Sequence, residues 1–197
     1  MSGAGEARLF AALELASEPA LSLRGWAREV AAGLGRDGRG AGLRVLEAES
    51  LHLTLCFLGA RPAGEIGELA SAMAEACQGV AAFELSLGAP VWLAPWRPRA
   101  LAVEVHDPAG ALAGLQAAVS GALAQAGAGE QPGRRFRPHI TVVRAGGRFT
   151  GPARIALPPT PAVSFNAERV ALIRSWLEPQ GARYEAQSTV RLGPVAG

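Results

Sequence analysis

A strand-like motif that occurs twice places the strongest constraint on how this chain can fold. Residues 50–59 read SLHLTLCFLG and residues 137–144 read RPHITVVR, so each segment contains His-x-Thr followed by an apolar residue. Apolar, β-branched and aromatic residues dominate both segments, which is typical of β-strands. Side chains alternate between the two faces of a strand, so the histidine and threonine of each motif share one face.

These shared faces predict a polar cleft where the two motif strands lie side by side. The cleft would hold two imidazoles and two hydroxyls, from His52, Thr54, His139 and Thr141. The same alternation predicts that Leu53, Leu55 and Phe57 point into a core. Cys56 has the parity of His52 and can therefore face the cleft.

The segments before the two motifs also resemble each other, which indicates a unit that is used twice. Each motif follows an apolar strand, a helix and a glycine-rich loop. The strands cover residues 8–15 and 99–105, the helices start at Ser17 and after Asp107, and the loops cover residues 33–42 and 127–133. In the first helix, Leu21, Trp26 and Val30 are expected to face the core. A strand–helix–loop–strand unit present twice predicts two pseudo-symmetric lobes within one domain, residues 1–197.

The remaining segments complete a mixed pattern of helices and strands. We expect a short strand at 43–46, a helix after 61–64, a strand at 83–87, a connection at 92–99, and a hairpin of residues 164–177 and 181–192 that turns at 178–181.

Positive and negative charges nearly balance, but the basic residues are all of one type. The formal net charge is only +2, and all 19 Lys-or-Arg positions are arginine. Arginine suits forked contacts to phosphate, whereas a GC-rich genome would also favour arginine throughout. Six arginines crowd around the second motif: Arg134, Arg135, Arg137, Arg144, Arg148 and Arg154.

Neither the cysteines nor the hydropathy pattern points to secretion or to a membrane. Cys56 and Cys77 lie in apolar surroundings and suggest reduced thiols, not a disulfide framework or a metal site. No apolar run reaches the length that a bilayer requires, and no signal-peptide pattern opens the chain. We therefore expect a cytoplasmic protein that does not associate with membranes.

Two histidines in one cleft suit acid-base chemistry at phosphorus. Histidine titrates near pH 6.5, so one ring can be neutral and act as a base while the other is protonated and acts as an acid. Threonine hydroxyls can donate to phosphate oxygens, and an arginine can offset the negative charge that develops. The sequence offers no acidic cluster for magnesium and no third ligand for zinc, so we expect a phosphoester reaction without metal or cofactor.

Several other residues are more readily explained as structural. His106 precedes Asp107-Pro108 and is expected at a turn or on the surface. Trp92 and Trp96 could stack on a base, but packing is the simpler role. The same two roles, stacking on a base and packing, stay open for Phe136 and Tyr184.

The paired motifs, HLTL at 52–55 and HITV at 139–142, resemble the signature of the 2H phosphoesterase superfamily. The closer resemblance is to its RNA 2′,3′-cyclic phosphodiesterase branch, also called 2′-5′ RNA ligase. Residues 8–13 (RLFAAL), 51–59, 136–141 (FRPHIT), 175–177 (SWL) and 181–184 (GARY) also fit that branch, so the resemblance spans nearly the whole chain.

The resemblance implies an α+β fold with two lobes, each an antiparallel sheet with helices, around a central cleft. It implies metal-free hydrolysis of a 2′,3′-cyclic phosphate to a 2′-phosphate, with reverse 2′-5′ joining of RNA ends also reported for the branch. Its partner would be RNA with a 2′,3′-cyclic phosphate terminus, such as a tRNA fragment, bound by a monomer. The implied roles are proton donor for His52, proton acceptor for His139, and phosphate binding for Thr54, Thr141 and Arg144.

The chain departs from the family pattern at a few positions away from the histidines. Arg174 stands where an acidic residue is common, Val142-Val143 replaces Leu-Ala, and lysine is absent. Two alternatives stay open: a 2H phosphodiesterase that acts on a small cyclic nucleotide, and a protein that binds RNA ends with little turnover.

Overall fold

The computed structural model describes residues 5–36, 40–94, 98–128, 135–149, 156–178 and 181–195. Trp96, Arg134, Arg154, the tip of the C-terminal hairpin (179–180) and parts of both predicted glycine-rich loops (37–39 and 129–133) lie outside these residues. The helical elements are α1 (Ser17–Arg36), η1 (Ala48–Ser50), η2 (Ala63–Glu65), α2 (Ile66–Ala76) and α3 (Ala111–Gln125). The strands are β1 (Glu6–Glu14), β2 (Leu43–Val45), β3 (His52–Pro62), β4 (Phe83–Leu93), β5 (Ala100–His106), β6 (His139–Ala145), β7 (Ser164–Ala167), β8 (Arg169–Glu178) and β9 (Gly181–Arg191).

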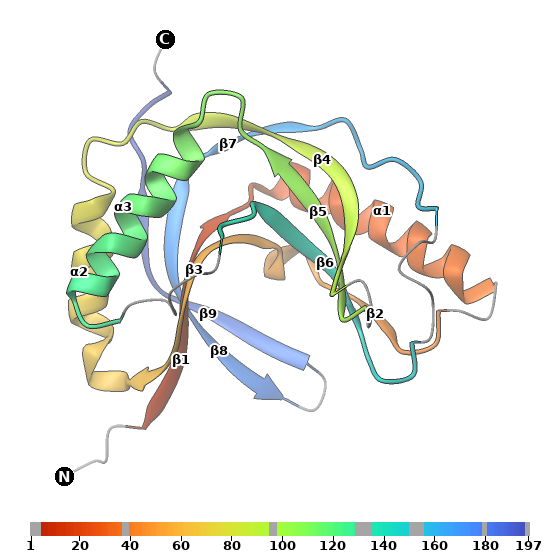
Figure 1. Cartoon of the computed structure of the whole chain (residues 1–197), viewed down its shortest axis with the longest axis horizontal. Helices are drawn as coiled ribbons and strands as arrows, with labels where there is room; N and C mark the ends of the chain where they lie inside the picture. Colours follow the sequence, from red (N-terminus) through yellow and green to blue (C-terminus); the bar gives the residue numbers. More distant parts are fainter. Residues whose placement is uncertain are drawn as a thin grey trace.

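All of these strands belong to one antiparallel sheet that curls through the molecule (Figure 1). The strand order is β7-β4-β5-β6-β3-β1-β8-β9, and β2 pairs with β6 beside this path. The sheet has two halves that meet at β6 and β3, and the repeated strands occupy matching positions, with β5 next to β6 and β1 next to β3. The predicted α+β fold is therefore confirmed, and the sheets of its two lobes join into a single sheet.

The junction between the halves is the pair of motif strands. In the described residues, these strands have one directly opposed pair, Leu53 of β3 and Ile140 of β6. These two are the central residues of the two His-x-Thr motifs. Both side chains are fully buried, with 0% of their surface exposed. Since neighbouring residues alternate faces, the histidines and threonines of both motifs lie on the opposite face of the sheet.

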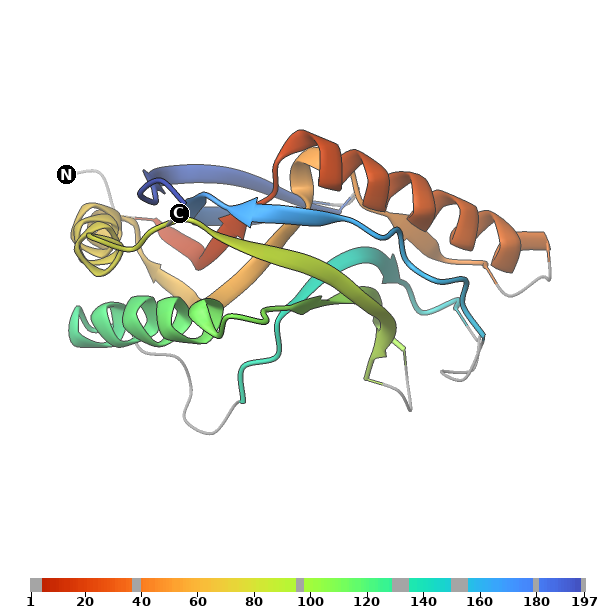
Figure 2. The ribbon, with the colours of Figure 1, turned by 90° about the horizontal axis from the view of Figure 1, so that it is seen from above.

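The helices α1 and α3 each pack on the half of the sheet to which their preceding strand does not belong (Figures 1 and 2). α1 follows β1 in sequence but contacts β2 and β6, whereas α3 follows β5 but contacts β3. α2 packs against α3 and against the C-terminal strands β8 and β9. Each helix of the repeated unit thus covers strands of the other half.

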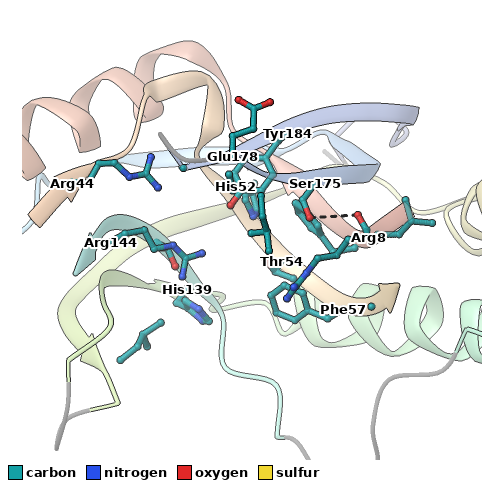
Figure 3. Close-up of a pocket in the computed structure, with 18 residues that line it drawn as sticks. Arg8, Arg44, His52, Thr54, Phe57, His139, Arg144, Ser175, Glu178 and Tyr184 are labelled. Carbon is teal, nitrogen blue, oxygen red and sulfur yellow. Dashed lines mark hydrogen bonds between the residues drawn. The ribbon is translucent and has the colours of Figure 1, made fainter. Parts of the chain in front are cut away.

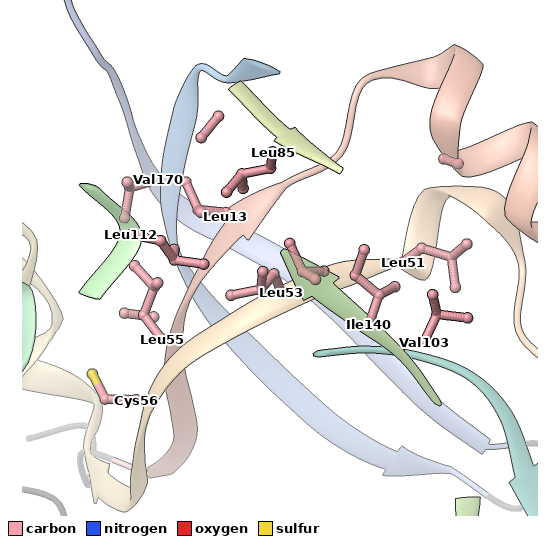
Figure 4. Close-up of a cluster of buried hydrophobic side chains, with 14 of the residues drawn as sticks. Leu13, Leu51, Leu53, Leu55, Cys56, Leu85, Val103, Leu112, Ile140 and Val170 are labelled. Atoms are coloured by element: carbon pink, nitrogen blue, oxygen red, sulfur yellow. The ribbon is translucent and has the colours of Figure 1, made fainter. Parts of the chain in front are cut away.

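One main hydrophobic core lies between the sheet and the helices (Figure 4). Leu13, Leu53, Leu85, Leu112 and Ile140, from β1, β3, β4, α3 and β6, are all at most 1% exposed. A second, smaller cluster of Phe10, Ala12, Ala171 and Ile173 lies on the other face of β1 and β8, and Tyr184 packs against it. No helix of the described residues is long and apolar enough to span a bilayer.

Three local predictions were wrong. α1 continues through Gly33 to Arg36, so the predicted loop begins later; tertiary packing of the buried Leu34 outweighs the helix-weakening glycines on either side. Leu21 points outward and is 58% exposed. The strand predicted at 83–87 runs to Leu93, because a register shift between Leu87 and Pro90 lets the sheet accommodate the proline.

The predicted C-terminal hairpin is only partly correct. β8 and β9 do form a hairpin, but the segment predicted as its first arm divides at Glu168. β7 pairs with β4 at the far edge of one half, whereas β8 pairs with β1 in the other half. The sequence pattern of one strand does not reveal which distant strand will pair with it.

Candidate active site

A cleft of about 670 Å³ opens on the polar face of the junction (Figure 3). His52, Thr54, His139, Thr141 and Arg144 all line it, as the sequence predicted. Further lining residues come from β1, β2, β8 and β9: Arg8, Phe10, Arg44, Ser175, Leu177, Glu178 and Tyr184 among them. The structure therefore brings the five candidate site residues together from two strands that are far apart in sequence.

β-bulges in β3 decide which of its side chains reach the cleft. Thr54 pairs with Ala12 and Cys56 pairs with Ala11, so Leu55 is an extra residue in β3. An extra residue inverts the alternation beyond it. Leu55 and Cys56 are consequently both buried in the core, and Phe57 lines the cleft with 47% of its surface exposed.

The predictions for Phe57 and Cys56 were therefore wrong, since simple alternation put Phe57 in the core and allowed Cys56 to face the cleft. Cys77 is also buried, and burial raises the pKa of its thiol to about 11. Neither thiol lines the cleft.

Both histidines are held in the same way by the backbone. The Nδ1–H of His52 donates to the carbonyl of Ser50 at 2.8 Å, and the Nδ1–H of His139 donates to the carbonyl of Arg137 at 2.7 Å. A carbonyl oxygen can only accept, so Nδ1 carries a proton in each ring. Nε2 is then the atom of each ring that is left to exchange a proton with a substrate.

The antiparallel register also relates each histidine to the threonine of the other motif. Because Leu53 lies opposite Ile140, Thr54 neighbours His139 and His52 neighbours Thr141. In β6, Thr141 pairs with Ala102 and Val143 pairs with Leu101, so Val142 is an extra residue that inverts the alternation beyond it. Arg144 therefore lies on the same side as His139 and contributes a guanidinium to the same cleft. Two proton-exchanging rings, two hydroxyl donors and one fixed positive charge thus converge on one space.

The environments of the two histidines differ despite this symmetry. Phe10 packs against the ring of His52 with a centroid distance of 4.8 Å, and Tyr184 meets that ring edge-on at 5.2 Å. Burial, together with the nearby charges of Arg144 and His139, lowers the pKa of His52 from 6.5 to about 4, although its bond to Ser50 acts in the opposite direction. His52 is therefore neutral at pH 7 in the protein without a ligand.

The low pKa of His52 predicts a loss of stability in acid. The unfolded chain takes up this proton near pH 6.5 but the folded protein only near pH 4, so the free energy of unfolding should fall as the pH drops through this range. The loss due to His52 should reach about 3 kcal/mol at pH 4. Urea unfolding of the wild type and of His52→Asn between pH 7 and pH 4 measures it. Equal pH slopes for the two proteins would contradict the prediction.

The arginines around the second motif do not all reach the cleft. Arg144 lines it, whereas Arg135 and Arg137 line an adjoining pocket of about 230 Å³ beside His139, and Arg148 lines neither. Sequence reasoning missed Arg8 and Arg44, which enter the cleft from β1 and β2. Their signal was parity: Arg8 shares a strand face with Phe10, and Arg44 alternates with the apolar Leu43 and Val45.

The other aromatic and histidine candidates lie in different surroundings. Trp92 is buried and stacks on Phe149 at 4.9 Å, so it is a packing residue. Phe136 lines the adjoining pocket, Tyr184 lines the cleft, and His106 is exposed at the end of β5. In the described part of the chain, no group of three or more His, Cys, Asp and Glu side chains could hold a metal ion.

Solved structures with this fold cover nearly the whole chain. The crystal structure of TT0787 from Thermus thermophilus is 27% identical, covers 95% of this chain and 98% of its own, and has a TM-score of 0.73. E. coli LigT in complex with 3′-AMP is 23% identical with the same coverage and a TM-score of 0.74. The MHV ns2 PDE domain is more distant, at 14% identity, 86% and 99% coverage and a TM-score of 0.58. No curated protein sequence matches the chain.

The sequence profile of the 2′-5′ RNA ligase superfamily matches residues 20–176, which include both His-x-Thr motifs and most of the sheet. The fold of the LigT-like structures and the family profile agree with the resemblance that the paired motifs carry. This chain belongs to the 2′-5′ RNA ligase superfamily of 2H phosphoesterases.

Proposed function

We propose that this protein hydrolyses 2′,3′-cyclic phosphate ends of RNA to 2′-phosphates, with His52 and His139 as its acid and base. The observation that carries the proposal is the convergence of the two rings. Each ring is anchored through Nδ1 to a backbone carbonyl, and both line a cleft that also holds two threonines and Arg144. A pair of orientated imidazoles beside hydroxyl and guanidinium donors suits in-line displacement at phosphorus.

In this scheme, His139 takes a proton from water through Nε2 as the water oxygen attacks phosphorus. The bond between phosphorus and O3′ breaks on the opposite side, and the Nε2–H of His52 gives its proton to O3′. The product carries a 2′-phosphate and a free 3′-hydroxyl. Thr54 and Thr141 donate to the non-bridging oxygens, and Arg144 offsets the charge that builds up there.

The low pKa of His52 sets a condition on its role as proton donor. A neutral ring has no proton to give through Nε2, so the substrate must raise the pKa of His52 when it binds. Burial lowers this pKa most, and the positive charge of Arg144 adds to the effect. An anionic phosphate in the cleft compensates that charge and favours the imidazolium.

The ligands bound in the solved structures also support the proposal. E. coli LigT has been crystallised with 3′-AMP, with ATP, with NADP+ and with phosphate. All of these ligands carry phosphate, and three of them are nucleotides. We infer that this chain acts as a cytoplasmic monomer on RNA termini such as those of tRNA fragments, and that it also joins RNA ends through a 2′-5′ linkage in the reverse direction.

A single assay tests the proposed reaction. The purified protein, in EDTA, is given a short RNA that ends in a 2′,3′-cyclic phosphate, and the product is identified as a 2′- or 3′-phosphate. We expect a 2′-phosphate at an undiminished rate in EDTA. Binding of this RNA without turnover would favour an RNA-end binding protein, and faster turnover of nucleoside 2′,3′-cyclic monophosphates than of RNA would favour a small-substrate enzyme.

A further inference from the structure

Two arginines lie side by side on neighbouring strands at one end of the cleft. Arg44 of β2 and Arg144 of β6 are direct partners in the antiparallel register. Side chains of such partners point to the same face of the sheet, with their Cβ atoms about 5 Å apart. Both side chains are exposed and line the cleft that holds the histidine pair (Figure 3).

This pairing is unfavourable in the protein without a ligand. Like charges directly opposite each other on a sheet are destabilising. Several arginines of this chain have a carboxylate partner, such as Arg61 with Glu65 and Arg169 with Glu14. Among the described residues, neither Arg44 nor Arg144 forms an ion pair. Two adjacent guanidiniums in a cleft are therefore matched to an anion of more than one charge, or to two anions.

The backbone makes room for the guanidinium of Arg44. Gly181, the first residue of β9, lies so close to it that a Cβ at this position would overlap Cζ and both terminal nitrogens of Arg44. Gly181 also has a φ of +134°, which L side chains rarely adopt. Arg44 thus extends from β2 in one half of the sheet to the β8–β9 hairpin of the other half, and it crosses one end of the cleft.

We propose that Arg44 binds a second phosphate group of the substrate, next to the cyclic phosphate that Arg144 contacts. This inference rests on the proposed function. The second phosphate is the one on the 5′ side of the terminal nucleotide, either the phosphodiester to the preceding nucleotide or a 5′-phosphate. The preferred substrate class is therefore a cyclic-phosphate end that carries at least one further phosphate, not a nucleoside 2′,3′-cyclic monophosphate.

The arginine on the opposite side of the cleft provides an internal comparison. Arg8 comes from β1 and lies beyond His52 and Thr54, on the side away from Arg44 and Arg144 (Figure 3). It carries the same charge in the same cleft but has no arginine partner in the register of its strand. If charge in the cleft were enough, Arg8 and Arg44 would contribute alike.

The experiment compares two substrates that differ by one phosphate: adenosine 2′,3′-cyclic monophosphate and the same nucleotide with a 5′-phosphate. The measured quantity is the ratio of their kcat/KM values in the wild type, Arg44→Ala, Arg44→Lys and Arg8→Ala. We expect Arg44→Ala to reduce the preference for the second phosphate about 10- to 100-fold, the range for a lost charge-assisted hydrogen bond. Arg44→Lys should recover part of the preference, and Arg8→Ala should keep the wild-type ratio.

Two further variants complete the test. Gly181→Ala should displace the guanidinium and lower the ratio as Arg44→Ala does. Arg28→Ala, an exposed arginine of α1 outside the cleft, should change neither rate. An unchanged ratio in Arg44→Ala, or an equal loss on both substrates, would overturn the assignment of Arg44. The absence of turnover by the wild type on both nucleotides and on a short RNA with a 2′,3′-cyclic phosphate end would instead overturn the proposed function, so the two failures are distinguishable.

Discussion

Replacing His52 or His139 by alanine is expected to lower the turnover of 2′,3′-cyclic phosphate ends by about 10²- to 10⁴-fold, the usual contribution of a positioned acid or base. Both rings are anchored at Nδ1 and line the same cleft, so neither can substitute for the other. The measurement is kcat/KM on a short RNA with a cyclic phosphate end. Thermal unfolding of each variant separates loss of chemistry from loss of fold.

The third histidine supplies the matched control. His106 is exposed at the end of β5 and does not line the cleft, so His106→Ala should keep the wild-type rate. The wild-type pH–rate profile should be bell-shaped because one ring must be protonated and the other neutral. Full activity in His52→Ala or His139→Ala would contradict the two-histidine scheme. A wild-type pH–rate profile without two limbs would contradict it as well.

Leu53→Ala should be the most destabilising single substitution among those considered, with a loss of about 2 to 5 kcal/mol in the free energy of unfolding. Leu53 is fully buried, and it is the β3 member of the pair that connects the two halves of the sheet. The substitution leaves a cavity at this junction, directly behind the histidine–threonine face. Urea unfolding at neutral pH measures the effect.

Leu21→Ala is the control with the same chemical change. Leu21 is 58% exposed on α1, so its truncation should alter the free energy of unfolding by less than about 0.5 kcal/mol. A Leu53→Ala variant as stable as Leu21→Ala would show that the junction does not hold the halves together. Because a loss of several kcal/mol is a large part of a typical domain stability, the Leu53 variant should also unfold at a much lower temperature.

The motif strands and the histidine pair could be predicted from the sequence because they depend on local rules. Alternation alone puts His52 with Thr54 on one face and Leu53 on the other, and the structure agrees. Alternation fails at Leu55, where a bulge inverts the parity and brings Phe57 into the cleft. A bulge depends on how β3 fits β1, which is a property of the pair and not of one strand.

Long-range placement accounts for the other failures. The strand character of residues 164–167 predicts an arm of the C-terminal hairpin, but β7 lies at the opposite edge of the sheet, where it pairs with β4. Arg44 alternates with apolar neighbours, but it reaches the cleft only because β2 pairs with β6, and the sequence of β2 does not reveal that partner. The environment of His52 likewise depends on Tyr184 from the β8–β9 hairpin. Such contacts arise from tertiary pairing, which local pattern does not encode.

The path of the chain through the sheet means that neither half is a continuous piece of the polypeptide. One half is built from β1, β3, β8 and β9, which come from both ends of the chain, and the other from β2 and β4 to β7. A truncation before β7 would therefore remove strands from both halves at once. Two fragments produced by a cut between β6 and β7 would each hold strands of both halves, so neither half of the sheet would be complete until the fragments reassociated.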